Sequence, residues 1–150
     1  MPCGGIFSKG GNLNALCQLS KIYAPLLGRI LFSFIFLQSG YDKIVNFPKT
    51  AALMTSKGMP MAEVLLVPAI VILLGGGLMI LFGWYARWGA LALLMFLIPA
   101  TLIFHSYWAY PEAQQLNQFH HLVKNVALMG ALLMIIGMGS GPLSLKSEKN

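Results

Sequence analysis

Charged residues are scarce in this sequence. Only 9% of its 150 residues are Asp, Glu, Lys or Arg, whereas a typical soluble domain contains about 25%. Hydrophobic residues make up 57% of the chain, and the mean hydropathy is +0.74. This composition excludes an ordinary soluble domain and predicts an integral membrane protein that forms one compact unit.

Cysteine and metal-binding patterns are also lacking. Cys3 and Cys17 precede the first apolar run at a spacing that matches no metal or redox motif. Three histidines without supporting cysteines argue against zinc or copper, so we expect no metal site.

A haem held by His105 and His121 is disfavoured because such membrane cytochromes usually supply more histidines. No carboxylate lies in the middle of the last three apolar runs, which argues against a proton-coupled exporter.

The excess of basic residues, formally +6, does not indicate nucleic-acid binding. Lys and Arg occur singly at the ends of apolar runs, where cations flank a membrane. With four spans, both termini lie on the same side of the bilayer. The terminal side carries Lys9, Lys21, Arg29, Arg87, Lys146 and Lys149, and the other side carries Lys43, Lys49, Lys57 and Lys124. The positive-inside rule therefore predicts cytoplasmic termini.

The apolar runs predict an all-α polytopic membrane protein, an antiparallel bundle of four transmembrane helices. The spans are expected at about 23–45, 62–83, 86–108 and 118–137, within a membrane domain of residues 22–139. Residues 1–21 and 140–150 are expected to be polar tails, and Thr50–Lys57 a short helix on the membrane surface. We expect glycines to let helices approach closely in lipid, at Gly40, Gly75, Gly76 and Gly77.

The first span carries charge near both of its ends. Arg29 and Asp42 are separated by twelve uncharged residues, which is only about 20 Å of helix against a hydrocarbon core of about 30 Å. Both charges cannot reach water comfortably if this helix spans the bilayer. At least one of them must snorkel or face the protein interior.

Polar residues from distant segments converge at one end of such a bundle. The first and third helices end there, and the second and fourth begin there. A polar pocket roofed by aromatic residues is predicted at this end, suited to a quinone headgroup or another small polar-headed lipid. The candidate pocket residues are Arg29, Gln38, Asp42, Lys43, His105, Lys124 and Asn125. Each of them also has a structural interpretation, as a snorkelling side chain or as a hydrogen bond between helices.

Several segments resemble the DoxX family of small four-helix membrane proteins. They are LGRILFSFIFLQSGYDKIVNF, KGMP, LLGGGLMILFGWYARWGALAL, TLIFHSYW, HLVKNVALMGALLM and GPLSL, which together extend from about Leu26 to Leu145. By position, the resemblance carries over Arg29, Ser39, Gly40, Lys43, Gly76, Gly77, Arg87, His105, Lys124 and Asn125. Many relatives have a Glu just before the glycines of the second helix, where this chain has Leu73.

The resemblance implies two kinds of function. The family takes its name from a subunit of a thiosulfate:quinone oxidoreductase, and relatives are associated with redox and electrophile stress. A small subunit of a quinone-linked oxidoreductase, working with a soluble redox partner in a bacterial inner membrane, is the first expectation. Lys43, Lys124 and His105 would hold the quinone oxygens, with Asp42 as counter-charge and no cofactor bound by a motif of the chain itself. The alternative is a non-catalytic scaffold or lipid- or cargo-binding protein, and either kind could form a homo-oligomer.

Overall fold

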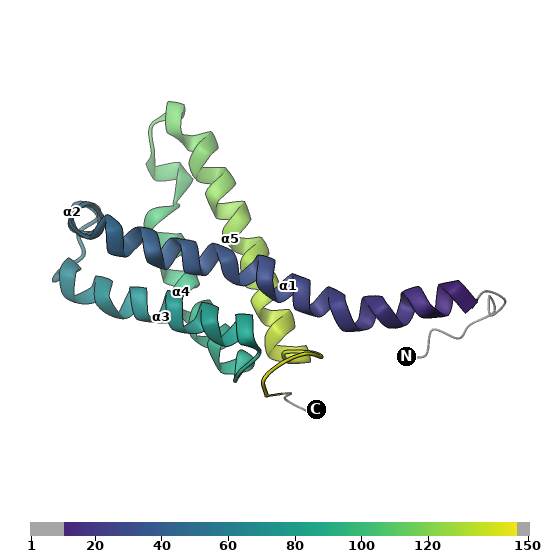
Figure 1. Ribbon diagram of the computed structural model, residues 1–150. Helices are drawn as coiled ribbons and strands as arrows, with labels where there is room; N and C mark the ends of the chain where they lie inside the picture. The colour runs from purple at the N-terminus through teal and green to yellow at the C-terminus, as the bar shows by residue number, and fades with distance from the viewer. Residues whose placement is uncertain (1–10, 147–150) are drawn as a thin grey trace.

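A computed structural model describes residues 11–146, which fold into helices joined by short loops, with no strand among them (Figure 1). The elements are α1 (Gly11–Val45), α2 (Phe47–Ser56), α3 (Ala62–Phe82), α4 (Ala86–Phe104), the 3₁₀ turn η1 (Tyr107–Ala109) and α5 (Glu112–Met138). Four of them, α1, α3, α4 and α5, are long and apolar enough to cross a membrane. The predicted all-α membrane fold is therefore confirmed.

The first helix begins earlier than the sequence pattern indicates. α1 starts at Gly11 rather than near Tyr23, so residues 11–21 are helical instead of a tail; residues 1–10 lie outside the described part. Pro25, expected in the first turn, lies inside the helix. Residues 15–21 contain good helix formers, which favours an earlier start. Pro25 lies well inside the 35 residues of α1, where it removes one backbone donor without ending the helix.

The ends of α4 and α5 also differ from the predicted spans, for reasons that lie in the local sequence. α4 ends at Phe104 and is capped by His105, so His105–Trp108 continue the span as an irregular turn and η1. α5 starts at Glu112, ahead of the predicted 118, because Pro111 stands at its N-cap and its carbonyl accepts the amides of Gln114 and Gln115.

The helices pack in chain order around a shared core. α1 packs on α3, α3 on α4 and α4 on α5, while α2 packs on both α1 and α3. In Figure 1, α1 and α3 run side by side. Among the described residues, the backbones of α1 and α5 do not approach each other closely. The α1–α3 pair and the α4–α5 pair are therefore joined mainly through the contact between α3 and α4.

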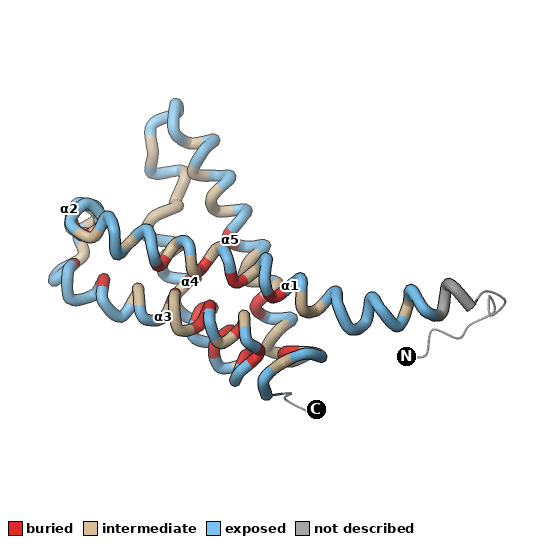
Figure 2. Tube along the Cα trace, in the orientation of Figure 1, coloured by how far each residue is buried: buried red, intermediate tan, exposed pale blue. Residues whose placement is uncertain are grey.

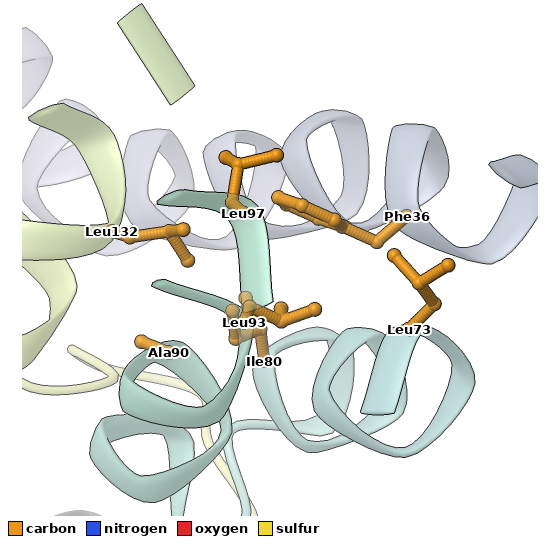
Figure 3. Close-up of a cluster of buried hydrophobic side chains, with 7 residues drawn as sticks. All are labelled: Phe36, Leu73, Ile80, Ala90, Leu93, Leu97 and Leu132. Atoms are coloured by element: carbon orange, nitrogen blue, oxygen red, sulfur yellow. The ribbon is translucent and has the colours of Figure 1, made fainter. Parts of the chain in front are cut away.

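Side chains from all four long helices form the core. The cluster in Figure 3 consists of Phe36, Leu73, Ile80, Ala90, Leu93, Leu97 and Leu132. Buried positions lie where the helices face one another, and the outer surfaces are largely exposed (Figure 2). Those outer surfaces carry many large apolar side chains, such as Leu31, Phe34 and Val71, which suits contact with lipid.

Two adjacent glycines of α3 allow two different helices to approach closely. A Cβ at Gly76 would lie 2.7 Å from Leu93 Cγ and 3.1 Å from the carbonyl oxygen of Gly89 on α4. A Cβ at Gly77 would lie 3.0 Å from Leu37 Cδ2 on α1, and one at Gly40 would lie 2.7 Å from Leu74 Cδ2 on α3. A Cβ at Gly75 would meet nothing within 4 Å. Close packing is therefore found at three of the four predicted glycines, and Gly75 is a correction because its side faces open space.

The segment after α5 binds back onto the bundle. Arg29 is only 5% exposed, and its Nη2 donates to the carbonyls of Pro142 (3.2 Å) and Leu143 (2.8 Å). The amides of Leu145 and Lys146 donate to the carbonyls of Phe82 and Gly83 at 3.0 and 3.3 Å. We call residues 140–146 the C-terminal strap. The prediction of a polar tail from residue 140 is corrected for these residues, whereas 147–150 lie outside the described part.

The two neighbouring glycines allow a matched test of helix packing. Gly76→Ala should lower the free energy of unfolding by about 1–3 kcal/mol, because the new methyl group overpacks the α3–α4 contact. Gly75→Ala gains the same helix propensity without the clash and should be neutral or stabilising by up to about 1 kcal/mol. Unfolding in mild detergent, followed by circular dichroism, measures both. Equal stability of the two variants would contradict the packing role.

The strap makes a second prediction, for Arg29→Met. Loss of the two charge-assisted hydrogen bonds should detach the strap and expose Lys146 to trypsin. Each such bond contributes about 1.5–3 kcal/mol, so cleavage after Lys146 should accelerate at least roughly tenfold. Mass spectrometry of timed digests measures the rate, and Lys21→Met, an exposed position on the same helix, is the control. Unchanged cleavage in Arg29→Met would show that other contacts hold the strap.

Candidate functional site

A cavity of about 560 Å³ lies at the end of the bundle opposite the strap. Its walls come from all five α-helices and from the loop between α2 and α3. Most of the lining is apolar and includes Phe36, Leu73, Phe96 and Leu97. Polar side chains line the cavity from the last turns of α1, from α2, from the residue that caps α4 and from the middle of α5; they are Ser39, Asp42, Lys43, Thr50, His105, Lys124 and Asn125. The cavity therefore combines a mainly apolar lining with a small set of polar side chains.

The last turns of α1 contribute a cation, an anion and a hydroxyl group to the cavity. Lys43 is partly buried, and its Nζ donates to Ser39 Oγ at 3.0 Å, one helical turn earlier. Asp42 Oδ1 accepts a hydrogen bond of 2.8 Å from Asn46 Nδ2. In the part of the chain that the structure describes, no ion pair joins Asp42 to Lys43. The ammonium group of Lys43 therefore keeps donors that no protein carboxylate occupies.

A histidine cluster stands across the cavity on α4 and α5. His105 Nδ1 lies 2.8 Å from Gln118 Oε1, and since an amide oxygen only accepts, Nδ1 is the donor. In a neutral His105 the remaining nitrogen, Nε2, is then an acceptor. His121 stacks on His105 with ring centroids 5.0 Å apart, and its Nδ1 lies 3.5 Å from Lys124 Nζ. His105 and Lys124 line the cavity, whereas His121 supports them from behind.

A buried hydrogen bond fixes α4 against α5 below this cluster. Asn125 is 7% exposed, and its Nδ2 donates to Thr101 Oγ1 at 3.0 Å. The hydroxyl of Thr101 in turn donates to the Leu97 carbonyl at 2.6 Å. Each of these polar groups thereby finds a partner without water, as buried polar groups require.

The structure brings together all but two of the candidate residues. Asp42, Lys43, His105, Lys124 and Asn125 line one cavity. Gln38 is exposed and does not line the cavity. Arg29 is bound to the strap at the other end of the bundle, so it does not belong to this site. Arg29 satisfies the predicted need for a charge in the first span to face the protein interior.

Some residues of the site were not among the candidates. Thr50, Met54 and Met59 line the cavity because α2 packs against α3 through Ala51 and Met54. The short helix predicted at Thr50–Lys57 is present as α2, which begins and ends slightly earlier. The three-residue spacing of Gln118 and His121 places both on one face of α5, a signal that could have identified the partner of His105. Leu73 is 2% exposed and lines the apolar wall.

The loops at this end are also joined to each other. Lys57 Nζ lies 4.1 Å from the centre of the Tyr110 ring, and the Tyr110 hydroxyl donates to the Phe104 carbonyl at 2.9 Å. The loop after α2 thus contacts the loop before α5, beside the cavity.

Comparison with known proteins agrees with a membrane protein. The sequence model of the DoxX family matches residues 24–106, more than half of the chain. Inner membrane protein YphA of Escherichia coli (strain K12) is 28% identical over 120 residues, which cover 80% of this chain and 86% of YphA. Inner membrane protein YqjF of the same organism is 31% identical over 121 residues, covering 80% and 87%. No solved structure matches the chain significantly. The extent of the family match and the four membrane-spanning helices together show that this chain belongs to the DoxX family of membrane proteins.

Proposed function

We propose that this protein binds a quinone in the cavity between its helices and serves as a small membrane subunit of a quinone-linked oxidoreductase. The observation that carries the proposal is the convergence of Lys43, His105 and Lys124, from three helices, at one end of an apolar cavity. Both relatives are described as inner membrane proteins, which supports a location in a bacterial inner membrane. Cytoplasmic termini remain the prediction from the charge distribution.

The residues present suit a quinone. A cavity of about 560 Å³ falls within the range of about 300–1,000 Å³ that is usual for small-molecule sites. Phe36, Phe96 and Leu97 offer an apolar surface to a ring and its tail. Lys43 has donors left for one ring oxygen. With Nδ1 of His105 donating to Gln118, Nε2 of the neutral ring can accept from a quinol hydroxyl, and Nε2 of the protonated ring can donate to a quinone carbonyl. Residues from both sides of the cavity can thus reach a headgroup.

The chemistry of such a subunit is divided between ligand and protein. A bound quinone would supply the capacity to take up two electrons and two protons. The side chains of this chain would bind and orient the ring, and Asp42 would offset part of the positive charge. We expect the electrons to come from a soluble redox partner, since no motif of the chain is typical of a flavin, haem or iron–sulfur site.

A non-catalytic scaffold is the second candidate function. The hydrogen bonds from Asn125 to Thr101 and between His105 and Gln118 both join the α4 end to α5. In this interpretation the polar cluster only locks the helices, and the protein organises lipid or a partner protein. The two functions predict different effects of a substitution at His105. A quinone-binding subunit should lose affinity for its ligand, whereas a scaffold should lose stability.

Substituting Lys43 and His105, which line the cavity from opposite sides, tests whether the cavity binds a quinone. Lys43→Met and His105→Ala should each weaken decylubiquinone binding by roughly ten- to a hundredfold, because each removes a hydrogen bond from a charged or aligned group. Calorimetric titration in mild detergent measures affinity, and native mass spectrometry shows whether near-stoichiometric quinone copurifies with the unmodified protein.

The chain offers matched controls for both substitutions. Lys49 and His120 are exposed and do not line the cavity, so Lys49→Met and His120→Ala should leave the affinity unchanged. Thermal unfolding of each variant separates loss of ligand from loss of fold. Unchanged quinone affinity in the Lys43 and His105 variants would sink the redox proposal. A lowered unfolding temperature in them, with no quinone bound to any form, would favour the scaffold.

A further inference from the structure

Two ammonium groups line the cavity from separate helices. Lys43 extends from the last turns of α1 and Lys124 from the first half of α5. The backbones of α1 and α5 do not pack closely within the described residues, so the two cations line the same cavity from helices that are not packing neighbours. Their interactions are with neutral partners, namely Ser39 Oγ at 3.0 Å for Lys43 and His121 Nδ1 at 3.5 Å for Lys124.

The carboxylates of the protein do not balance this charge. Asp42 is the acidic residue that lines the cavity, and its described hydrogen bond comes from Asn46. The other acidic residues in the described part, Glu63 and Glu112, are exposed and do not line the cavity. Two lysines and one aspartate leave one unbalanced positive charge beside a mainly apolar lining, with His105 as the remaining titratable group there.

An unbalanced charge next to apolar walls favours a ligand that neutralises it. Lys43 is half-buried, whereas Asp42 and Lys124 are exposed at the edge of the cavity. Charge interactions are stronger at the half-buried Lys43 than in water, and an ammonium group binds an anionic oxygen more tightly than a neutral carbonyl. A single negative oxygen between Lys43 and Lys124 would complete the site, while its tail filled the apolar part of the cavity.

We propose that this cavity selects amphiphiles whose headgroup carries one anionic oxygen. This proposal rests on the proposed function only because it concerns the same cavity. It narrows the ligands from quinones and lipids in general to those with one anionic headgroup oxygen. The anionic oxygen could belong to the ionised hydroxyl of a quinol or hydroxyquinone, or to the carboxylate of a fatty acid. Neutral quinones and alcohols of equal tail length are the weaker ligands.

Two pairs of probes test the preference. One pair is an acidic alkyl-hydroxynaphthoquinone and its methyl ether; the other is a medium-chain fatty acid and the corresponding alcohol. Calorimetric titration of the full chain in neutral, non-ionic detergent should show roughly ten- to a hundredfold tighter binding of the acidic member of at least one pair, as expected for one charge-assisted hydrogen bond.

Variants of the two lysines test whether these residues cause the preference for the acidic probes. Lys43→Met and Lys124→Met should each reduce the acid-to-neutral ratio towards unity, whereas Lys124→Arg, which keeps the charge, should retain most of it. Lys49→Met, at an exposed position outside the cavity, should leave the ratio unchanged. Retention by the arginine variant shows that charge, not loss of folding, is responsible.

The outcomes separate this inference from the quinone proposal. Equal affinity for the acidic and neutral members of both pairs would overturn the anion preference and leave quinone binding intact. Tight binding of the fatty acid alone would support the anion site and overturn the quinone-linked function. An acid preference that persists in both Met variants would also overturn the inference, because the charge would then act from elsewhere.

Discussion

Close packing on both faces of α3 is the constraint on which the rest of the fold depends. Gly76 lets α4 approach one face, and Gly77 lets α1 approach another. In lipid the hydrophobic effect cannot draw apolar helices together, so van der Waals contact at small residues takes its place. The sequence of α3 is apolar all round because its inner faces pack on α1 and α4, while exposed residues such as Val64, Val71 and Leu78 face outward, which suits contact with lipid. The positions of α1 and α4, and hence of the cavity between the helix pairs, follow from these contacts.

The sequence predicts the four spans and the depth of the polar cluster well. Length and hydropathy determine where a helix can cross a bilayer, and antiparallel order then places Lys43, His105 and Lys124 at one end. These inferences need only position along the chain. Rotation about a helix axis is harder to predict when every face is apolar, which is why Gln38 and Gly75 face away from the protein's interior contacts although their neighbours do not.

Contacts between distant segments account for the remaining differences. The binding of Arg29 to carbonyls of the strap depends on an irregular turn after α5. Such a turn has no periodic sequence pattern from which it could be predicted. The packing of α2 onto α3 depends on Ala51 and Met54 meeting Leu66, a match of shapes rather than of composition. Thr50, Met54 and Met59 became part of the cavity wall through this packing and not through any motif.

The bond between Arg29 and the strap also governs the order in which the protein can be completed. Arg29 and Pro142 are separated by 113 positions in the sequence, and at synthesis rates of about 5–20 residues per second the partner emerges roughly 5 to 25 seconds after the arginine. During that interval the first helix carries a cation whose acceptors have not yet been made. The buried position of Arg29 against the strap can therefore form only after residues 142 and 143 have been made.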